Sequence, residues 1–300
     1  MDIEMNIVGE SLGTILRKWD ADDAILYALG VGAGAVPGGT ELAYTTENSD
    51  GVPQRVLPSY AAVLGFPPLG FLGDGELDGP TLLGDFQPSA ILHADQELSV
   101  HGILPAAGTV RVTAVVAGVH DTGEHVLITI ATQLTDAGNG SGLADSRATF
   151  LVRGAGGFGG PRPEPDRWHL PRRAPDHVLD YATMPAQGLL YRLSGDRNRL
   201  HSDPVAAREA GFDRPILHGL CTFGFAGRAL LHAACGGNPA RFGSMSARFT
   251  SPVMPGDALT VRLWDDGGQV KFQVRVGDRV VMDRGRFSPS TPNSKGDGND

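Results

Sequence analysis

The sequence predicts an α+β fold built from two similar halves, in each of which a helix is followed by several antiparallel strands. Short segments in both halves carry apolar residues at the three- and four-residue spacing of a helix, and long runs rich in β-branched residues follow them. A Gly- and Pro-rich segment over residues 153–165 can form neither a helix nor a central strand, and it divides the chain almost in half. We therefore expect two units, each with a helix packed on a curved sheet, that pair through their sheets.

The first half begins with a short helix over residues 22–30, because Asp22 stands at its start, apolar side chains recur at helical spacing and Gly30 closes it. Residues 55–66 fit either a second apolar helix or a buried strand. The runs that predict strands cover residues 90–100, 109–117, 125–133 and 146–152.

The second half repeats this plan. A short helix is expected over residues 202–211, with Asp203 as its N-cap, Pro204 in its first turn and Gly211 after its last turn. Residues 217–234 predict one long apolar helix. The strand-like runs that follow cover residues 244–250, 258–264, 270–276 and 280–287.

These patterns divide the chain into four parts. They are an N-terminal unit over residues 1–152, a linker over 153–175, a C-terminal unit over 176–287 and a tail over 288–300. The tail is rich in Ser, Pro, Asn and Gly, a composition that predicts disorder.

The composition indicates an ordinary soluble globular protein, with 41% hydrophobic and 20% charged residues among 300. A net charge of −9 without a basic cluster argues against a nucleic-acid partner. The acidic N-terminus predicts no signal peptide, and no apolar run approaches the roughly 18 residues of a membrane helix, so we expect no membrane partner. Cys221 and Cys235 would lie about 20 Å apart along a helix, too far for a disulfide, and we expect a cytoplasmic location.

The strongest candidate for chemistry is the short segment that holds Asp196, Asn198 and His201 just before a helix start. A carboxylate and a neutral imidazole can share proton transfer to and from water at neutral pH. The turn at Gly195 and the fixed backbone of Pro204 hold the loop at both ends, which suits a preorganised site. The alternative is that Asp196 only caps a turn and His201 is a hydrogen-bonded loop histidine.

Gly219 follows His218 at the start of the long helix, where a backbone N–H has no partner within the helix. Such an N–H can stabilise an anionic enolate oxygen. The alternative for Gly219 is close packing of the helix on the sheet. His218 fits a capping or core-edge residue better than a second base.

Two other kinds of site have weaker support. His201, Asp203 and His218 could bind a metal, but their spacing matches no compact zinc signature, and we expect no metal. The Gly-rich run over residues 30–34 follows a helix rather than a strand, so it predicts a loop and not a dinucleotide site.

The segments YRLSGDRNRLHSDP (191–204) and AGFDRPILHGLCTFG (210–224) resemble the motif of the hydratase 2 family, the MaoC-like (R)-specific enoyl-CoA hydratases. The chain is also similar to the hydratase 2 domain of peroxisomal multifunctional enzyme type 2. It extends over about residues 5–287 and includes Leu92-His93, the glycine-rich linker and Phe249 followed by Pro252-Val253.

The resemblance implies a double hotdog fold, in which two units, each a long helix wrapped by an antiparallel sheet, pair side by side. It also implies reversible hydration of trans-2-enoyl-CoA to (3R)-3-hydroxyacyl-CoA, without a metal or organic cofactor, by a homodimer. Residue by residue, it makes Asp196 and His201 the catalytic pair, Asn198 the supporting amide and Gly219 the oxyanion donor. The positions matching acyl-CoA contacts or adjoining the motif, which we expect to bind substrate, are His93, Ala94, Arg197, Arg199, Leu200, His218 and Phe249.

The sequence departs from the family pattern at three places. Arg199 stands where Pro is usual, Ala94 where some members have Gly, and Thr122 where a Lys is sometimes found near CoA. These changes bear on CoA affinity and leave the catalytic set intact.

The first half has no counterpart of the catalytic motif. We therefore expect that it lost a duplicate site and holds the acyl tail in an apolar tunnel. Three other functions remain open: an acyl-CoA thioesterase, a dehydratase acting on acyl-carrier-protein thioesters, and a non-catalytic acyl-binding module.

Overall fold

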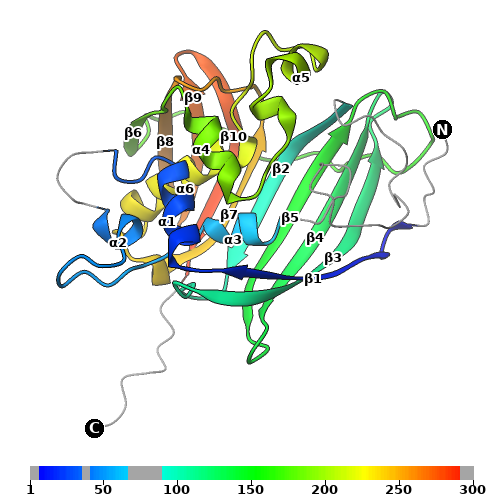
Figure 1. Cartoon of the computed structure of the whole chain (residues 1–300). Helices are drawn as coiled ribbons and strands as arrows, with labels where there is room; N and C mark the ends of the chain where they lie inside the picture. The colour runs from blue at the N-terminus through cyan, green and yellow to red at the C-terminus, as the bar shows by residue number, and fades with distance from the viewer. Residues whose placement is uncertain (1–6, 36–40, 67–89, 291–300) are drawn as a thin grey trace.

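A single ten-stranded antiparallel sheet forms the scaffold of this computed structural model, which describes residues 7–35, 41–66 and 90–290. The strand order is β1-β3-β4-β5-β2-β7-β10-β9-β8-β6 (Figure 1). The strands are β1 (Ser11–Trp19), β2 (Ile91–Val100), β3 (Gly108–Asp121), β4 (Val126–Asp136), β5 (Gly142–Val152), β6 (His177–Ala182), β7 (Phe242–Phe249), β8 (Ala258–Asp266), β9 (Gln269–Val276) and β10 (Arg279–Pro289). The α-helices are α1 (Ala21–Gly30), α2 (Leu42–Thr45), α3 (Tyr60–Leu64), α4 (Gln187–Tyr191), α5 (Pro204–Glu209) and α6 (Gly219–Ala233).

The two halves of the chain each supply five adjacent strands, and they join where β2 pairs with β7. An ion pair reinforces this seam, because Arg248 Nε lies 2.6 Å from Asp95 Oδ1 and the two residues are register partners. The units therefore lie side by side, as the resemblance implied.

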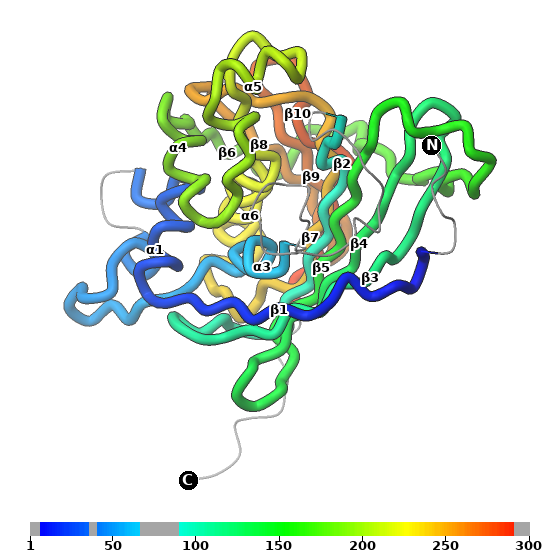
Figure 2. The backbone as a smooth tube through the Cα atoms, turned by 45° about the vertical axis from the view of Figure 1, so that its right-hand side comes forward, coloured from blue at the N-terminus to red at the C-terminus, as the bar shows by residue number. Residues whose placement is uncertain are grey.

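The helices lie mainly on one half of this sheet. Figures 1 and 2 show α1, α4 and α6 together beside strands β6–β10, with α3 near the junction of the two halves. In the described part of the first half the helices have 10, 4 and 5 residues, whereas α6 has 15. The first unit thus has no described helix as long as α6. None of the described helices has the length and apolar composition of a membrane span.

The predicted elements are confirmed in most places. Helix α1 begins one residue earlier than expected, because Asp20 and Asp23 form a reciprocal capping box. Residues 60–64 are helical, which settles the alternative left open for 55–66. Helix α5 has the predicted Asp203 cap, and Gly211 follows it with a φ of 88°. Cys221 and Cys235 are both buried free thiols.

Two strands were missed, β1 and β6, and they are the two edges of the sheet. An edge strand buries little of either face, so its sequence alternates weakly. Leu16 in β1 and Val178 in β6 are in fact exposed apolar residues. The pattern that identifies a half-buried strand is therefore absent from both segments.

The predicted start of the disordered tail was wrong. Ser288 and Pro289 belong to β10 and pair with Ser244 and Phe242, and the Ser290 N–H donates to the Arg241 carbonyl. Residues 291–300 of the predicted tail lie outside the described residues.

The segment predicted as a linker, residues 153–175, has neither helix nor strand. It is held against both units: the Asp121 carboxylate accepts the N–H groups of Gly157 and Gly159, and the Trp168 indole donates to the Gly285 carbonyl. The two units also share their largest apolar core, in which Tyr27 and Tyr60 meet side chains of α6. The exact domain boundaries stay a prediction.

A buried ion pair fastens the first half onto α6. Arg228, on α6, donates to both carboxylate oxygens of Glu41 at 2.9 and 2.6 Å and to the Val31 carbonyl at 2.8 Å. His232 and the Gly34 N–H also bond to Glu41. Burial by itself raises the pKa of Glu41, but the hydrogen bonds from His232 and Arg228 outweigh it and hold this pKa at about 2.

Replacing Arg228 with Leu is therefore expected to destabilise the fold by about 3–5 kcal/mol, because it leaves the buried Glu41 carboxylate with only His232 and the Gly34 N–H as partners. Urea unfolding measures this loss. Arg173→Leu, which removes an exposed partner of Asp176, is the matched control and should change stability little. Replacing both Glu41 and Arg228 with Leu should cost less than Arg228→Leu alone. If Arg228→Leu lowered the free energy of unfolding by less than about 1 kcal/mol, as the loss of an exposed ion pair does, the Arg228–Glu41 pair would not stabilise the fold as proposed.

Candidate active site

The loop between α4 and α5 carries the predicted catalytic residues. It contains two short 3₁₀ turns, Arg192–Ser194 and Arg199–His201, separated by Gly195 with a φ of 137°. That backbone angle strongly favours glycine, and it lets the chain turn directly before Asp196. Asp196 thus follows a tight bend.

Asn198 ties the two predicted catalytic side chains to one turn. Its backbone N–H donates to Asp196 Oδ1 at 3.0 Å, and its side-chain Oδ1 accepts the Leu200 N–H at 3.0 Å. The second bond caps the turn that carries His201. Asn198 therefore orients both Asp196 and His201.

His201 has one ring nitrogen engaged by the backbone. Its Nδ1 lies 2.9 Å from the Ile216 carbonyl, so we assign the proton to Nδ1 and leave Nε2 as an acceptor. Burial lowers the pKa of His201, and the charge of Asp196 opposes this effect only in part. The ring is therefore neutral at neutral pH.

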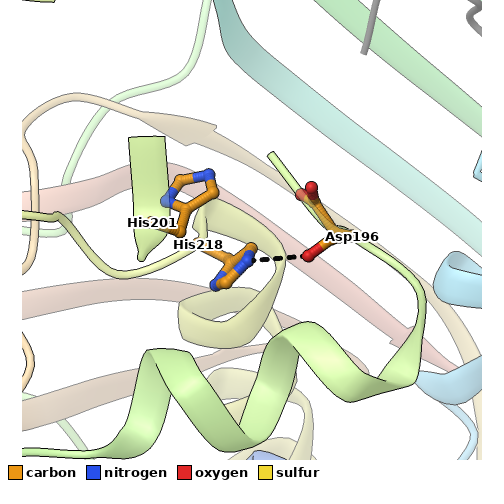
Figure 3. A group of neighbouring side chains, drawn as sticks. All are labelled: Asp196, His201 and His218. Atoms are coloured by element: carbon orange, nitrogen blue, oxygen red, sulfur yellow. Dashed lines mark hydrogen bonds between the residues drawn. The ribbon is translucent and has the colours of Figure 1, made fainter. Parts of the chain in front are cut away.

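The side chains of Asp196, His201 and His218 converge. One carboxylate oxygen of Asp196 and one ring nitrogen from each histidine all lie within 4.8 Å of one another (Figure 3). One water molecule can bridge polar atoms at such a separation, since each of its hydrogen bonds spans about 2.8 Å. The proximity that acid–base catalysis needs is present.

An apolar cavity of about 270 Å³ opens beside Asp196 and His201. Asp196, Asn198, Leu200, His201 and Gly219 contribute to its lining, together with His93, Ala94 and Phe249 from the sheet. The cavity thus brings residues of both units together.

His93 forms part of an aromatic wall of this cavity. Its ring stacks on Phe150 with centroids 5.1 Å apart and meets the edge of Phe249 at 5.0 Å. Burial lowers the pKa of His93 to about 4, so at neutral pH the ring is an uncharged surface.

Ala94 owes its place to a β-bulge. The pairing of β2 with β5 skips from His93 to Asp95, which leaves Ala94 without a register partner. A bulge twists the strand and redirects its side chains, so consecutive residues His93 and Ala94 both reach the cavity.

Gly219 is the first residue of α6, and its N–H therefore has no acceptor inside the helix. A Cβ atom at this position would lie 3.3 Å from the Phe249 ring. The close approach of Phe249 supports the packing explanation, and Gly219 also lines the cavity, while its role as an oxyanion donor stays a prediction.

A second cavity, of about 390 Å³, meets the first at Asp196. Phe66 and Leu220 also line both cavities. Arg197 lines the second cavity and not the first. Its remaining wall comes largely from β1 and α3 of the first unit.

Two predicted substrate-binding residues do not reach either cavity. Arg199 is largely exposed and pairs with Asp203, four residues later. His218 is only 1% exposed and lies behind His201. Their predicted contact with substrate has no support from the cavities and stays a prediction.

Sequence reasoning also missed residues that the cavities contain, among them Phe66, Phe150 and Phe212. The sequence around an apolar side chain does not show whether that side chain will line a cavity or fill a core, whether it stands on a strand, as Phe150 does, or in a loop, as Phe66 and Phe212 do. Only the spatial arrangement identifies them.

Asp203 does not join the histidines in a metal site. Its carboxylate caps α5 through the Val205 N–H and pairs with Arg199. The close group is instead Asp196, His201 and His218, in which each imidazole already uses one nitrogen on a backbone carbonyl. The expected absence of a metal stays a prediction.

Two family models match consecutive parts of the chain. The MFE-2 hydratase 2 N-terminal domain matches residues 18–154, and the MaoC like domain matches residues 168–283. The second match contains the whole candidate catalytic loop.

Two full-length relatives resemble this chain. A Mycobacterium tuberculosis protein named 3-hydroxyacyl-thioester dehydratase Y is 43% identical over 296 residues, which cover 95% of this chain and 98% of that protein. The peroxisomal enoyl-CoA hydratase 2 of Arabidopsis thaliana is 36% identical over 294 residues and 93% of each chain.

Solved structures agree with this picture. The crystal structure of a MaoC-like dehydratase from Phytophthora capsici superposes with a TM-score of 0.85 at 33% identity, covering 99% of this chain and 100% of that one. A Mycobacterium tuberculosis protein described as a double hotdog fold gives a TM-score of 0.57 at 16% identity over 94% and 96% of the two chains. The latter likeness concerns the fold alone and confirms the predicted architecture.

Proposed function

This chain belongs to the MaoC-like hydratase 2 family of (R)-specific hydro-lyases, and from that premise we propose that it hydrates trans-2-enoyl-CoA reversibly to (3R)-3-hydroxyacyl-CoA. The observation that carries the proposal is the convergence of Asp196 and His201 at the wall of an apolar cavity. Hydration needs a water molecule held by an acid and a base beside a bound enoyl thioester.

In this mechanism Asp196 and His201 hold one water between them, and its oxygen attacks C3 of the enoyl thioester. The electrons of the C2–C3 double bond shift to the thioester oxygen, which forms an enolate beside the Gly219 N–H. Asp196 takes one proton from the water as its oxygen attacks, and it returns that proton to C2 from the same face as the new hydroxyl. Positioned acid–base groups contribute about 10²–10⁴-fold, and one oxyanion donor about 3–4 kcal/mol.

The second cavity supports a place for the acyl tail. Seven of its lining residues come from β1, α3 and the segment next to α3: the charged Arg17 and Lys18 and the apolar or aromatic Leu16, Tyr60, Val63, Leu64 and Phe66. We propose that the tail passes Asp196 and enters this space, so that the first unit sets the accepted chain length. Chains longer than the first cavity can hold would then be substrates.

Filling the second cavity is expected to shorten the range of substrates. Val63→Phe should lower kcat/KM for a C16 enoyl-CoA by about 10–200-fold, the range for lost room beside apolar side chains, and leave C4 turnover nearly unchanged. Rates across C4 to C16 measure this difference. Val178→Phe, at an exposed valine on the far edge strand, is the matched control. Equal effects on short and long chains would contradict the assignment.

A second candidate is dehydration of 3-hydroxyacyl thioesters on an acyl carrier protein. The relative with 43% identity is named a 3-hydroxyacyl-thioester dehydratase, and the reverse reaction uses the same groups. The kcat/KM values for one acyl chain on CoA and on a carrier protein decide between the carriers.

The expected homodimer stays a prediction.

The loss of the enoyl-thioester absorbance band tests the proposed activity, and a thiol-reactive dye in a parallel assay tests its main rival. A hydratase removes the band and releases no thiol, because the thioester is conserved. A thioesterase on this fold would release free CoA. Binding without either change would identify a non-catalytic module.

A further inference from the structure

His218 occupies a place that neither substrate contact nor simple helix capping explains. It is the N-cap residue of α6, but its side chain makes no capping hydrogen bond. The ring is 1% exposed and lines neither cavity. Its contacts are instead with the two proposed catalytic residues and with Tyr191.

The contact with Asp196 is through the backbone. His218 Nε2 lies 3.3 Å from the Asp196 carbonyl oxygen, and Figure 3 shows this bond as a dashed line. Since a carbonyl only accepts, the Nε2–H of His218 is the donor. The bond ties the peptide that carries the Asp196 carboxylate to the start of α6.

The contact with His201 is through the ring face. The two imidazoles stack with centroids 3.8 Å apart and planes 29° apart. On its far side His218 meets the Tyr191 ring at 4.9 Å, and Tyr191 in turn lies 6.2 Å from Tyr27 in the shared core. A column of rings thus leads from the core to His201.

We propose that His218 is a positioning residue that fixes the separation of Asp196 and His201, by holding the backbone of the first and the ring plane of the second. The proposal rests on the proposed function, in which these two groups share one water. A rigid separation matters because misplacement by about 1 Å can cost 10²-fold in rate.

The choice of histidine at this position supports a role for the donor. His218 Nδ1 is one of the few buried polar atoms in the described structure without a hydrogen-bond partner. Such an unpaired atom is unfavourable, and phenylalanine would fill similar space without it. The Nε2–H bond to Asp196 is what phenylalanine cannot make. Burial, with a smaller effect of His201, keeps the pKa of His218 well below its ordinary value, so the ring stays neutral.

Two variants separate the two contacts. His218→Phe keeps a ring against His201 and removes the donor, and His218→Gln keeps a donor and removes the ring. We expect each to lower kcat by about 10–100-fold with KM within about twofold of wild type, because the substrate does not touch this residue. His218→Phe should also change the nitrogen-15 NMR signals of His201, a readout that needs no activity.

His101→Gln, at a half-exposed histidine of the first unit, is the matched control and should keep the wild-type kcat. Circular dichroism shows whether each variant folds. Because one variant removes the contact with Asp196 and the other removes the contact with His201, either of them tests the proposal if it folds. Unchanged kcat together with unchanged His201 signals would overturn the proposal, as would a raised KM at constant kcat. Absence of hydration by the wild-type protein would instead remove the proposed function, and the NMR comparison would still test the positioning.

Discussion

Replacing Asp196 with Asn is expected to lower kcat for enoyl-CoA hydration by about 10²–10⁴-fold. The amide has the shape of the carboxylate and can still accept the Asn198 N–H through its oxygen, so the loop should keep its conformation. It cannot take a proton from water. The loss therefore measures proton transfer rather than folding, and steady-state rates with a C4 or longer enoyl-CoA reveal it.

The neighbouring Asp203 provides the matched control. It lies in the same segment, lines neither cavity and caps α5, a role that Asn fills equally well. Asp203→Asn should keep nearly the full rate. If Asp196→Asn remained as active as Asp203→Asn, Asp196 could not be the acid–base group.

Removing the imidazole of His201 is expected to have a loss of similar size. His201→Ala deletes the unprotonated Nε2 that we place against the water, and a loss of about 10²–10⁴-fold in kcat follows. Added free imidazole should restore part of the rate by entering the space that the side chain leaves. The control is His101→Ala, on the first unit. This variant should keep the wild-type kcat, and added imidazole should not change it.

The double variant Asp196→Asn with His201→Ala adds a test of cooperation. Groups that act on one water function as a unit, so the double loss should be close to either single loss. Losses that multiply would show that the two residues act independently, contrary to the mechanism.

Much of the fold could be predicted because the central strands alternate strongly and α6 is a long, nearly continuous apolar segment. The exceptions have physical reasons. Strands β1 and β6 are sheet edges whose exposed residues, such as Leu16 and Val178, break the alternation. The helix at Tyr60–Leu64 is only five residues long, too short for its period to be distinguished from a buried strand.

The centre of the site could be predicted from local sequence, because Asp196, Asn198 and His201 share one loop and Gly219 begins the next long helix. The distant wall could not. His93 and Ala94 were assigned only through the resemblance, since the bulge that turns them toward the cavity has no sequence signature.

Two expected substrate contacts, His218 and Arg199, lie outside both cavities. A histidine at the start of a helix has the same sequence context whether its ring faces the cavity or the core, so the direction of His218 could not be inferred. Arg199 differs, because Asp203 stands four residues later, and that spacing is a visible sign of an ion pair.

Hydration in heavy water with stereochemical analysis of the product tests the central claim most directly. If one water delivers both the hydroxyl and the proton between Asp196 and His201, the product is (3R)-3-hydroxyacyl-CoA with deuterium at C2 on the same face as the hydroxyl. Deuterium on the opposite face would contradict the shared water, and a (3S) product would contradict the proposed stereochemistry.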